Sequence, residues 1–161
     1  MALETIVVPA SIARRLREEA EKLGLSPEEY LVELLLRDLD PPERAREYIE
    51  ASKSLLEEAR EELHRGDVRQ AAEKAWGAAA LAIKAYAAWR EGRRLTSHGE
   101  LWECMRRAAR ELGEWVRDAW AHANAMHVCF YEGWCARDDV EKALERIERL
   151  VSGIERRIRS G

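Results

Sequence analysis

The sequence contains very few side-chain amides, with a single glutamine, Gln70, and a single asparagine, Asn124, among its 161 residues. Charged residues, by contrast, make up 36% of the chain, and most of them are glutamate and arginine. Scarce labile amides together with abundant charge are typical of thermophile proteins. We therefore expect a thermophilic protein.

Long apolar runs are also missing. No segment approaches the roughly 20 apolar residues that a membrane-spanning helix requires, and the first residues lack the basic and apolar regions of a signal peptide. The three cysteines, Cys104, Cys129 and Cys135, are an odd number without the spacing of metal ligands. We therefore expect a soluble cytoplasmic protein with no membrane association, no metal and no cofactor, whose reduced cysteines act as small hydrophobic residues.

The composition is that of a folded protein of one domain, or of one domain with a small appendage. Hydrophobic residues make up 47% of the chain, which is enough for a core. The net charge of -4 gives no overall attraction to nucleic acids or anionic membranes. Local arginine clusters are interleaved with glutamate, so they indicate a solvated helix face with ion pairs.

Residues 1–39 predict a short strand followed by two helices. Glu4–Val8 is the single β-like run of the sequence, and it ends at Pro9. Ser26 caps the second helix, with Pro27 at its first position and Glu29 closing a capping box. This order resembles a ribbon-helix-helix element, which normally dimerises by pairing its strands. We expect residues 1–39 to serve in dimerisation or docking.

Residues 40–161 predict a helical bundle, so the fold class is all-α. The helix from Val68 to about Arg90 is rich in alanine at its centre, and small side chains let neighbouring helices approach closely. We expect it in the middle of the bundle. Gly113 is expected to bend or split the next long helical segment. Helix starts are indicated by the capping residues Asp40, Asp67 and Ser97.

The segment from Trp115 to Cys135 mixes apolar bulk with polar groups on two helix faces. One face carries His122, and the opposite face carries Arg117, Asn124, His127 and Tyr131. We expect this helix to be buried on more than one side. Buried polar groups need partners, so they indicate either a structural network or a functional site.

Three runs of this sequence carry a family resemblance. The run from Arg117 to His122 is similar to the arginine–polar–any three–histidine motif of HEPN domains. The run from Gln70 to Ala75 is similar to the Q-A-A-E-K run on the first long helix of that superfamily. More closely, residues 40–152 resemble the archaeal PaREP family of HEPN-like helical bundles, through E-K-A-W-G-A-A-A-L-A-I-K-A-Y-A and M-H-V-C-F-Y-E-G-W.

The resemblance implies a homodimer and, in many HEPN proteins, a metal-independent ribonuclease with its site at the dimer cleft. Arg117 would bind the scissile phosphate as a bidentate cation. His122 would act as general acid or base, with Asp118 orienting its ring. Other members of the superfamily are inactive relatives that bind nucleotide or only assemble.

Helix geometry makes it difficult for a single chain to form this Arg117–His122 site. Arg117 and His122 are five residues apart, so on one helix they point about 140° from each other. A shared site would need a second protomer or a local distortion. His127 lies on the Arg117 face with Asn124 and Tyr131, which makes it the better geometric candidate for a polar pocket.

Three functions follow from these observations. The favoured one is a homodimer whose Arg117-centred cleft acts on RNA or binds a nucleotide. The second is a non-enzymatic homo-oligomeric assembly or regulatory protein, in which the same residues only fix the dimer. The third, a DNA-binding regulator, is less favoured because the strand carries no basic residue for base readout.

Overall fold

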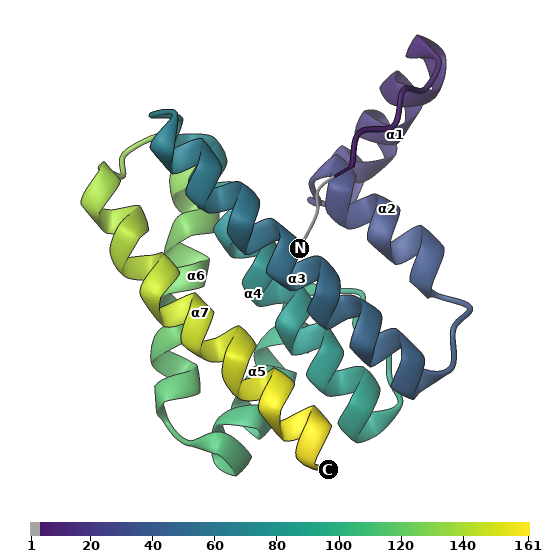
Figure 1. Cartoon of the computed structure of the whole chain (residues 1–161), viewed down its shortest axis with the longest axis vertical. Coiled ribbons are helices and arrows are strands. Elements are labelled where there is room, and N and C mark those ends of the chain that lie inside the picture. The colour runs from purple at the N-terminus through teal and green to yellow at the C-terminus, as the bar shows by residue number, and fades with distance from the viewer. Residues whose placement is uncertain (1–3) are drawn as a thin grey trace.

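The computed structural model describes residues 4–161, and this part of the chain forms seven α-helices (Figure 1). None of these helices combines the length and apolarity needed to cross a bilayer, within the described residues. The helices are α1 (Ala10–Lys22), α2 (Pro27–Leu36), α3 (Pro41–His64), α4 (Val68–Glu91), α5 (His98–Leu112), α6 (Trp115–Glu132) and α7 (Arg137–Ser160).

Helix α4 lies at the centre of a five-helix bundle and contacts α3, α5, α6 and α7. Every residue from Ala75 to Ala88 is buried. Alanine side chains there leave the backbone accessible to neighbouring helices, which explains the close packing on all sides. The predicted all-α fold and the central place of the alanine-rich helix are confirmed.

Most helix boundaries lie where the sequence predicts them. Ser26, Asp67 and Ser97 each accept a hydrogen bond from a backbone N–H in the first turn, at 3.1, 3.1 and 3.2 Å. Gly113 separates α5 from α6 with a φ of +126°, a conformation that side chains disfavour. Asp40 is the N-cap residue of α3, so the predicted helix start is confirmed, but its side chain makes no capping hydrogen bond in the described chain.

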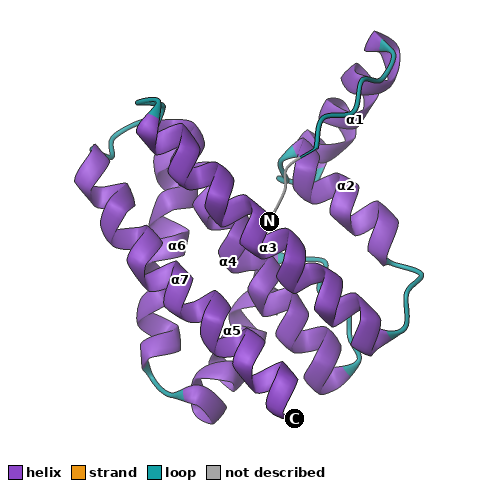
Figure 2. Cartoon of the chain, in the orientation of Figure 1, coloured by secondary structure: helices purple, strands orange, loops and turns teal. Residues whose placement is uncertain are grey.

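Helices α1 and α2 project from the bundle, and we refer to residues 4–36 as the arm (Figure 1). The predicted strand at Glu4–Val8 is not formed: residues 4–9 are an exposed loop, and no strand occurs among residues 4–161 (Figure 2). A strand needs a neighbour to pair its backbone N–H and C=O groups, and one copy of the arm offers none. Residues 1–3 of the predicted element lie outside the described residues.

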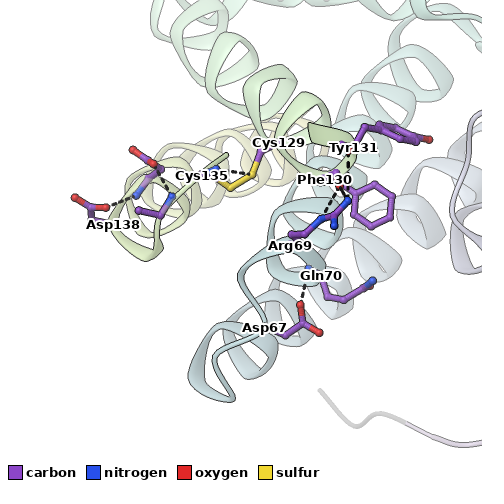
Figure 3. Close-up of a disulfide and its surroundings, with 10 residues drawn as sticks. Asp67, Arg69, Gln70, Cys129, Phe130, Tyr131, Cys135 and Asp138 are labelled. Atoms are coloured by element: carbon purple, nitrogen blue, oxygen red, sulfur yellow. Dashed lines mark hydrogen bonds between the residues drawn. A yellow bond between two sulfur atoms is a disulfide. The ribbon is translucent and has the colours of Figure 1, made fainter. Parts of the chain in front are cut away.

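A disulfide joins Cys129, near the end of α6, to Cys135 in the loop before α7 (Figure 3). The prediction that all cysteines are reduced is therefore wrong for this pair, whereas Cys104 is a free, buried thiol. The reason lies in the tertiary structure. Helix α6 ends at Gly133 in a left-handed conformation, and the chain then turns back so that the two Cα atoms lie 5.7 Å apart. The adjacent Phe130 carbonyl accepts two hydrogen bonds from Arg69 of α4, at 2.9 and 2.6 Å.

Candidate functional site

A cavity of about 300 Å³ lies between the arm and the bundle. Its walls are the turn between α1 and α2, one face of α2, one face of α4, and the loop that leads into α5. Residues four apart on a helix lie on the same face. Two such stripes line the cavity. One is formed by Glu29 and Glu33 of α2 with Arg37, the residue just after this helix, and the other by Trp76, Ala80 and Lys84 of α4.

Glu29 is the most unusual residue of this cavity. It is only 1% exposed, and burial raises the pKa of its carboxyl group to about 7. Its Oε1 atom lies 3.4 Å from the Ser26 hydroxyl, and its Oε2 atom has no hydrogen-bond partner in the described chain. Gly77 of α4 makes room for this carboxylate, since a Cβ atom there would lie 3.1 Å from Glu29 Oε1.

A second buried carboxylate, Glu33, is fully engaged. Its Oε1 atom accepts a hydrogen bond from Lys84 Nζ at 2.8 Å, and both of its oxygens lie 3.1 Å from the Tyr48 hydroxyl. Arg94, from the loop before α5, approaches Glu33 Oε2 at 3.5 Å. This network fixes Lys84, which is only 5% exposed, in the wall of the cavity.

Three aromatic rings stack beside these charges. Trp76 lines the cavity, with the imidazole rings of His98 at 5.3 Å and His127 at 4.7 Å from its centroid. Burial is the main cause of a lowered pKa of His98. His127 Nδ1 lies 3.4 Å from the buried carboxylate of Glu73, so that ring is held behind the cavity wall.

Arg117 and His122, the predicted catalytic pair, are not brought together within one chain. Arg117 is exposed on α6, and its Nε atom donates to Glu114 Oε2 at 3.1 Å. The half-buried His122 contacts its own helix instead, with Nδ1 2.9 Å from the carbonyl oxygen of Asp118. Asp118 therefore contacts the His122 ring through its backbone, while its carboxylate accepts from Arg146 of α7 at 3.3 Å.

The other predicted site residues divide between surface and cavity wall. Asn124 is half-buried on α6. Tyr131 is exposed, and its ring packs edge-on against His127 at 5.2 Å. Of the predicted residues, His127 thus lies nearest to the cavity, and Tyr131 lies beside it.

Sequence reasoning missed Glu29, Glu33 and Lys84 as a group. The capping-box prediction gives Glu29 only a local role, and no predicted contact pairs Glu33 with Lys84. One signal was present: Lys84 interrupts an otherwise apolar run in the alanine-rich helix. A lone cation in a buried stretch implies an acidic partner from elsewhere in the fold.

The polar side chains of the cavity carry carboxylate, ammonium, guanidinium and imidazole groups. Among residues 4–161, no cluster of metal-ligating side chains occurs. No curated protein and no solved structure matches this chain. The model of one family, described as the archaeal PaREP1/PaREP8 family, matches residues 47–151, more than half of the chain. The protein therefore belongs to the archaeal PaREP1/PaREP8 family.

Proposed function

We propose that this protein is a HEPN-like bundle that binds a nucleotide in the cavity between the arm and the bundle. The HEPN-like assignment is supported by the Gln70–Ala75 run on the central helix and by the Arg117–His122 run on α6. A binding function is supported by the cavity itself, which has the size and mixed polarity of small-molecule sites.

One observation supports this function most directly. The Glu29 carboxylate is buried, its pKa is raised to about 7, and its Oε2 atom lacks a partner among the described residues. A buried polar atom without a partner costs roughly 1–3 kcal/mol, and more when it is charged. Folding alone gives no reason to keep such a group. Buried charged groups with a shifted pKa beside a cavity are typical of functional sites.

The surroundings of Glu29 favour a nucleotide among small ligands. Arg37 and Arg94 line the cavity and remain partly exposed, as is suitable for contacting a phosphate. Trp76, His98 and Leu101 supply flat and apolar surface for a base. Lys84, in the cavity wall, supplies a donor for its polar edge.

Calorimetric titration of the full chain with the four ribonucleoside monophosphates tests this function. We expect at least one of them to bind, with quenching of tryptophan fluorescence because Trp76 lines the cavity. Lys84→Met or Arg94→Ala should weaken binding roughly 10- to 100-fold, the effect of losing a charged hydrogen bond. The matched control Lys142→Met alters an exposed lysine of α7 and should leave binding unchanged. Absence of binding by all four nucleotides at millimolar concentration would refute the proposal.

A second candidate function, metal-independent RNA cleavage, is favoured by the state of His122. A carbonyl oxygen only accepts hydrogen bonds, so the contact with Asp118 places the proton on Nδ1 and leaves Nε2 as a base. Because Arg117 lies apart from His122, a second copy of the chain would have to complete the site.

Cleavage of a labelled RNA in EDTA tests this second function. We expect the activity to be lost in Arg117→Ala and in His122→Ala, and retained in His64→Ala, which alters an exposed histidine at the end of α3. Cleavage that survives His122→Ala would exclude this mechanism. A purely structural role for Arg117 and His122 would instead appear as loss of assembly or of thermal stability without any nuclease activity.

We also propose that the protein is a homodimer joined through the arm. Among residues 4–161, eight of the eleven exposed large hydrophobic residues lie between Ile6 and Leu35. Exposed apolar surface of this extent on one element is typical of protein–protein contact. Glu4–Val8, unpaired in one chain, could pair with the same segment of a second copy.

A further inference from the structure

The Glu29 carboxyl group lies in the contact between the arm and the bundle. It is 1% exposed, and a Cβ atom at Gly77 of α4 would lie 3.1 Å from its Oε1 atom. Leu55 of α3 borders the same space, since its Cδ1 atom would lie 3.0 Å from that Cβ atom. Together these three residues line a second, much smaller cavity of about 20 Å³. Glu29 is therefore an arm residue whose carboxyl group is buried against α3 and α4.

Few polar contacts compensate for the burial of this group. Its Oε2 atom has no hydrogen-bond partner in the described chain, and its Oε1 atom lies 3.4 Å from the Ser26 hydroxyl. The neighbour from α3 is the apolar Leu55. The charged groups around it come from α2, α4 and α6, and they are Glu28, Glu73, Lys74, Lys84 and His127. Lys84 and His127 favour the ionised carboxylate, Glu73 opposes it, and burial outweighs them all, so that the pKa rises to about 7.

The rest of the contact between the arm and the bundle is small. Helix α1 projects away and packs on α2, while α2 packs on α3 (Figure 1). Glu33 adds an ionic contact with Lys84 at 2.8 Å, and Val32 and Leu36 pack on the core. A turn at residues 37–40 connects α2 to α3. Rotation about this turn would carry Glu29 into solvent without unfolding α4.

We propose that Glu29 is a proton-dependent latch of the arm. The arm packs on the bundle while this carboxyl group carries a proton, and it separates from the bundle when the group ionises. Separation hydrates the carboxylate, which removes the cost of burying an uncompensated charge. It also opens the larger cavity, because α2 forms one of its walls. The latch does not depend on the proposed nucleotide binding, which a separated arm would weaken.

The direction of the pH dependence follows from the raised pKa. The pKa of Glu29 is about 7 in the packed arm, against an ordinary value of 4.5 in solvent. Its contribution to packing is therefore complete below pH 4.5 and is lost as the pH rises through 7. Between pH 5.5 and pH 8.5, this difference multiplies the ratio of separated to packed arm by about 30.

Hydrogen exchange of the full chain at pH 5.5 and pH 8.5 tests the latch, with rates expressed as protection factors that remove the intrinsic effect of pH. We expect the protection of the α2 amides to fall about 30-fold at the higher pH, while the α4 amides keep theirs. In Glu29→Gln, which stays neutral, α2 should be equally protected at both pH values. The matched control Glu28→Gln alters the next residue of the helix, whose side chain is 54% exposed, and should keep the fall.

Each other outcome decides against the latch or is resolved by a second variant. Equal protection of α2 at both pH values in the original protein overturns it. An equal fall in α4 also overturns it, because the whole fold would then be losing stability. A fall that persists in Glu29→Gln assigns the effect to another group. If Glu29→Gln leaves α2 unprotected throughout, the neutral and similarly long Glu29→Met decides: pH-independent protection supports the latch, and any other result overturns it.

Discussion

The arm and the bundle place their side chains in opposite ways. In the bundle, apolar residues such as Leu81 and Ile147 are fully buried, and most charges face solvent, with Arg44, Glu73 and Lys84 as buried exceptions. In α2 of the arm, Glu29 is buried and Glu33 is largely covered, whereas Leu35 is 68% exposed. The bundle follows the pattern that stabilises a single folded chain. The arm departs from this pattern because it buries carboxylates and exposes leucine.

This difference indicates that the bundle residues serve stability and that the arm residues serve binding. Buried carboxylates and exposed leucines both raise the free energy of an isolated chain. The inner face of the arm forms one wall of the cavity, and its outer face offers apolar surface to a partner. The arm is therefore the part of the molecule in which binding, rather than folding, best accounts for the residues present.

The largest expected effect on stability comes from replacing a leucine of the bundle by alanine, compared with the same replacement in the arm. Leu81→Ala in the fully buried centre of α4 should lower the free energy of unfolding by about 2–5 kcal/mol, because it removes packed atoms and leaves a cavity. Leu35→Ala in the arm should change it by less than about 0.5 kcal/mol. Urea unfolding of both variants, followed by circular dichroism, measures the difference. Similar losses in both would mean that Leu35 is packed in solution.

Glu29→Gln tests the cost of the buried charge. The folded-state pKa of about 7 lies above the ordinary glutamate value of 4.5, so this group's contribution to stability is complete below pH 4.5 and is lost as the pH rises through 7. At pH 8 the variant should be more stable than the original protein, by up to about 3 kcal/mol, and at pH 5 the gain should be small.

Urea unfolding at pH 5 and pH 8 measures this dependence, with Glu145→Gln as the exposed control. If the gain in stability were the same at both pH values, it would not come from titration of Glu29.

Reduction of the Cys129–Cys135 disulfide should have a moderate effect on the bundle. The loop has a sequence separation of six residues, for which the chain-entropy relation gives a stabilisation of about 2 kcal/mol. Cys135→Ser should lower the unfolding midpoint, and dithiothreitol should lower that of the original protein but not that of the variant. Equal sensitivity to the reductant in both would show that another thiol is responsible.

Substitutions on the outer face of the arm should have the smallest effect on folding but a large effect on assembly. Val7→Glu and Leu35→Glu place charges on surface that a second copy would cover, so the dimer should dissociate while the bundle keeps its melting temperature. Sedimentation equilibrium measures the mass. The control is Arg156→Glu, at an exposed position of α7. A chain that is monomeric before any substitution would contradict dimerisation through the arm.

Much of the fold could be predicted because its signals are local. Ser26, Asp67 and Ser97 satisfy free N–H groups in the turn that follows them, and Gly113 ends α5 through its own backbone conformation. The strand prediction at Glu4–Val8 failed for the opposite reason. A strand is completed by a neighbour, and the local sequence does not supply one.

The candidate site was less predictable because it is built between elements. His127 could be assigned to a polar pocket from its helix face. Glu29 could not, because the same Ser26–Glu29 spacing is equally consistent with a solvated capping box and with a carboxylate that points into the bundle. The Cys129–Cys135 pair was missed because its closure depends on the turn at Gly133.

The sequence alone determined where most of the helices begin and the central place of α4, since capping residues and an alanine-rich run act within a turn or two of the chain. Only the tertiary structure decided that α2 buries Glu29 and places Glu33 against Lys84, while Leu31 and Leu35 face solvent. That choice depends on the space left by Gly77 and on the ammonium group opposite, which lie about 50 residues away in the chain. Burial and charge pairing over such separations are properties of the assembled fold.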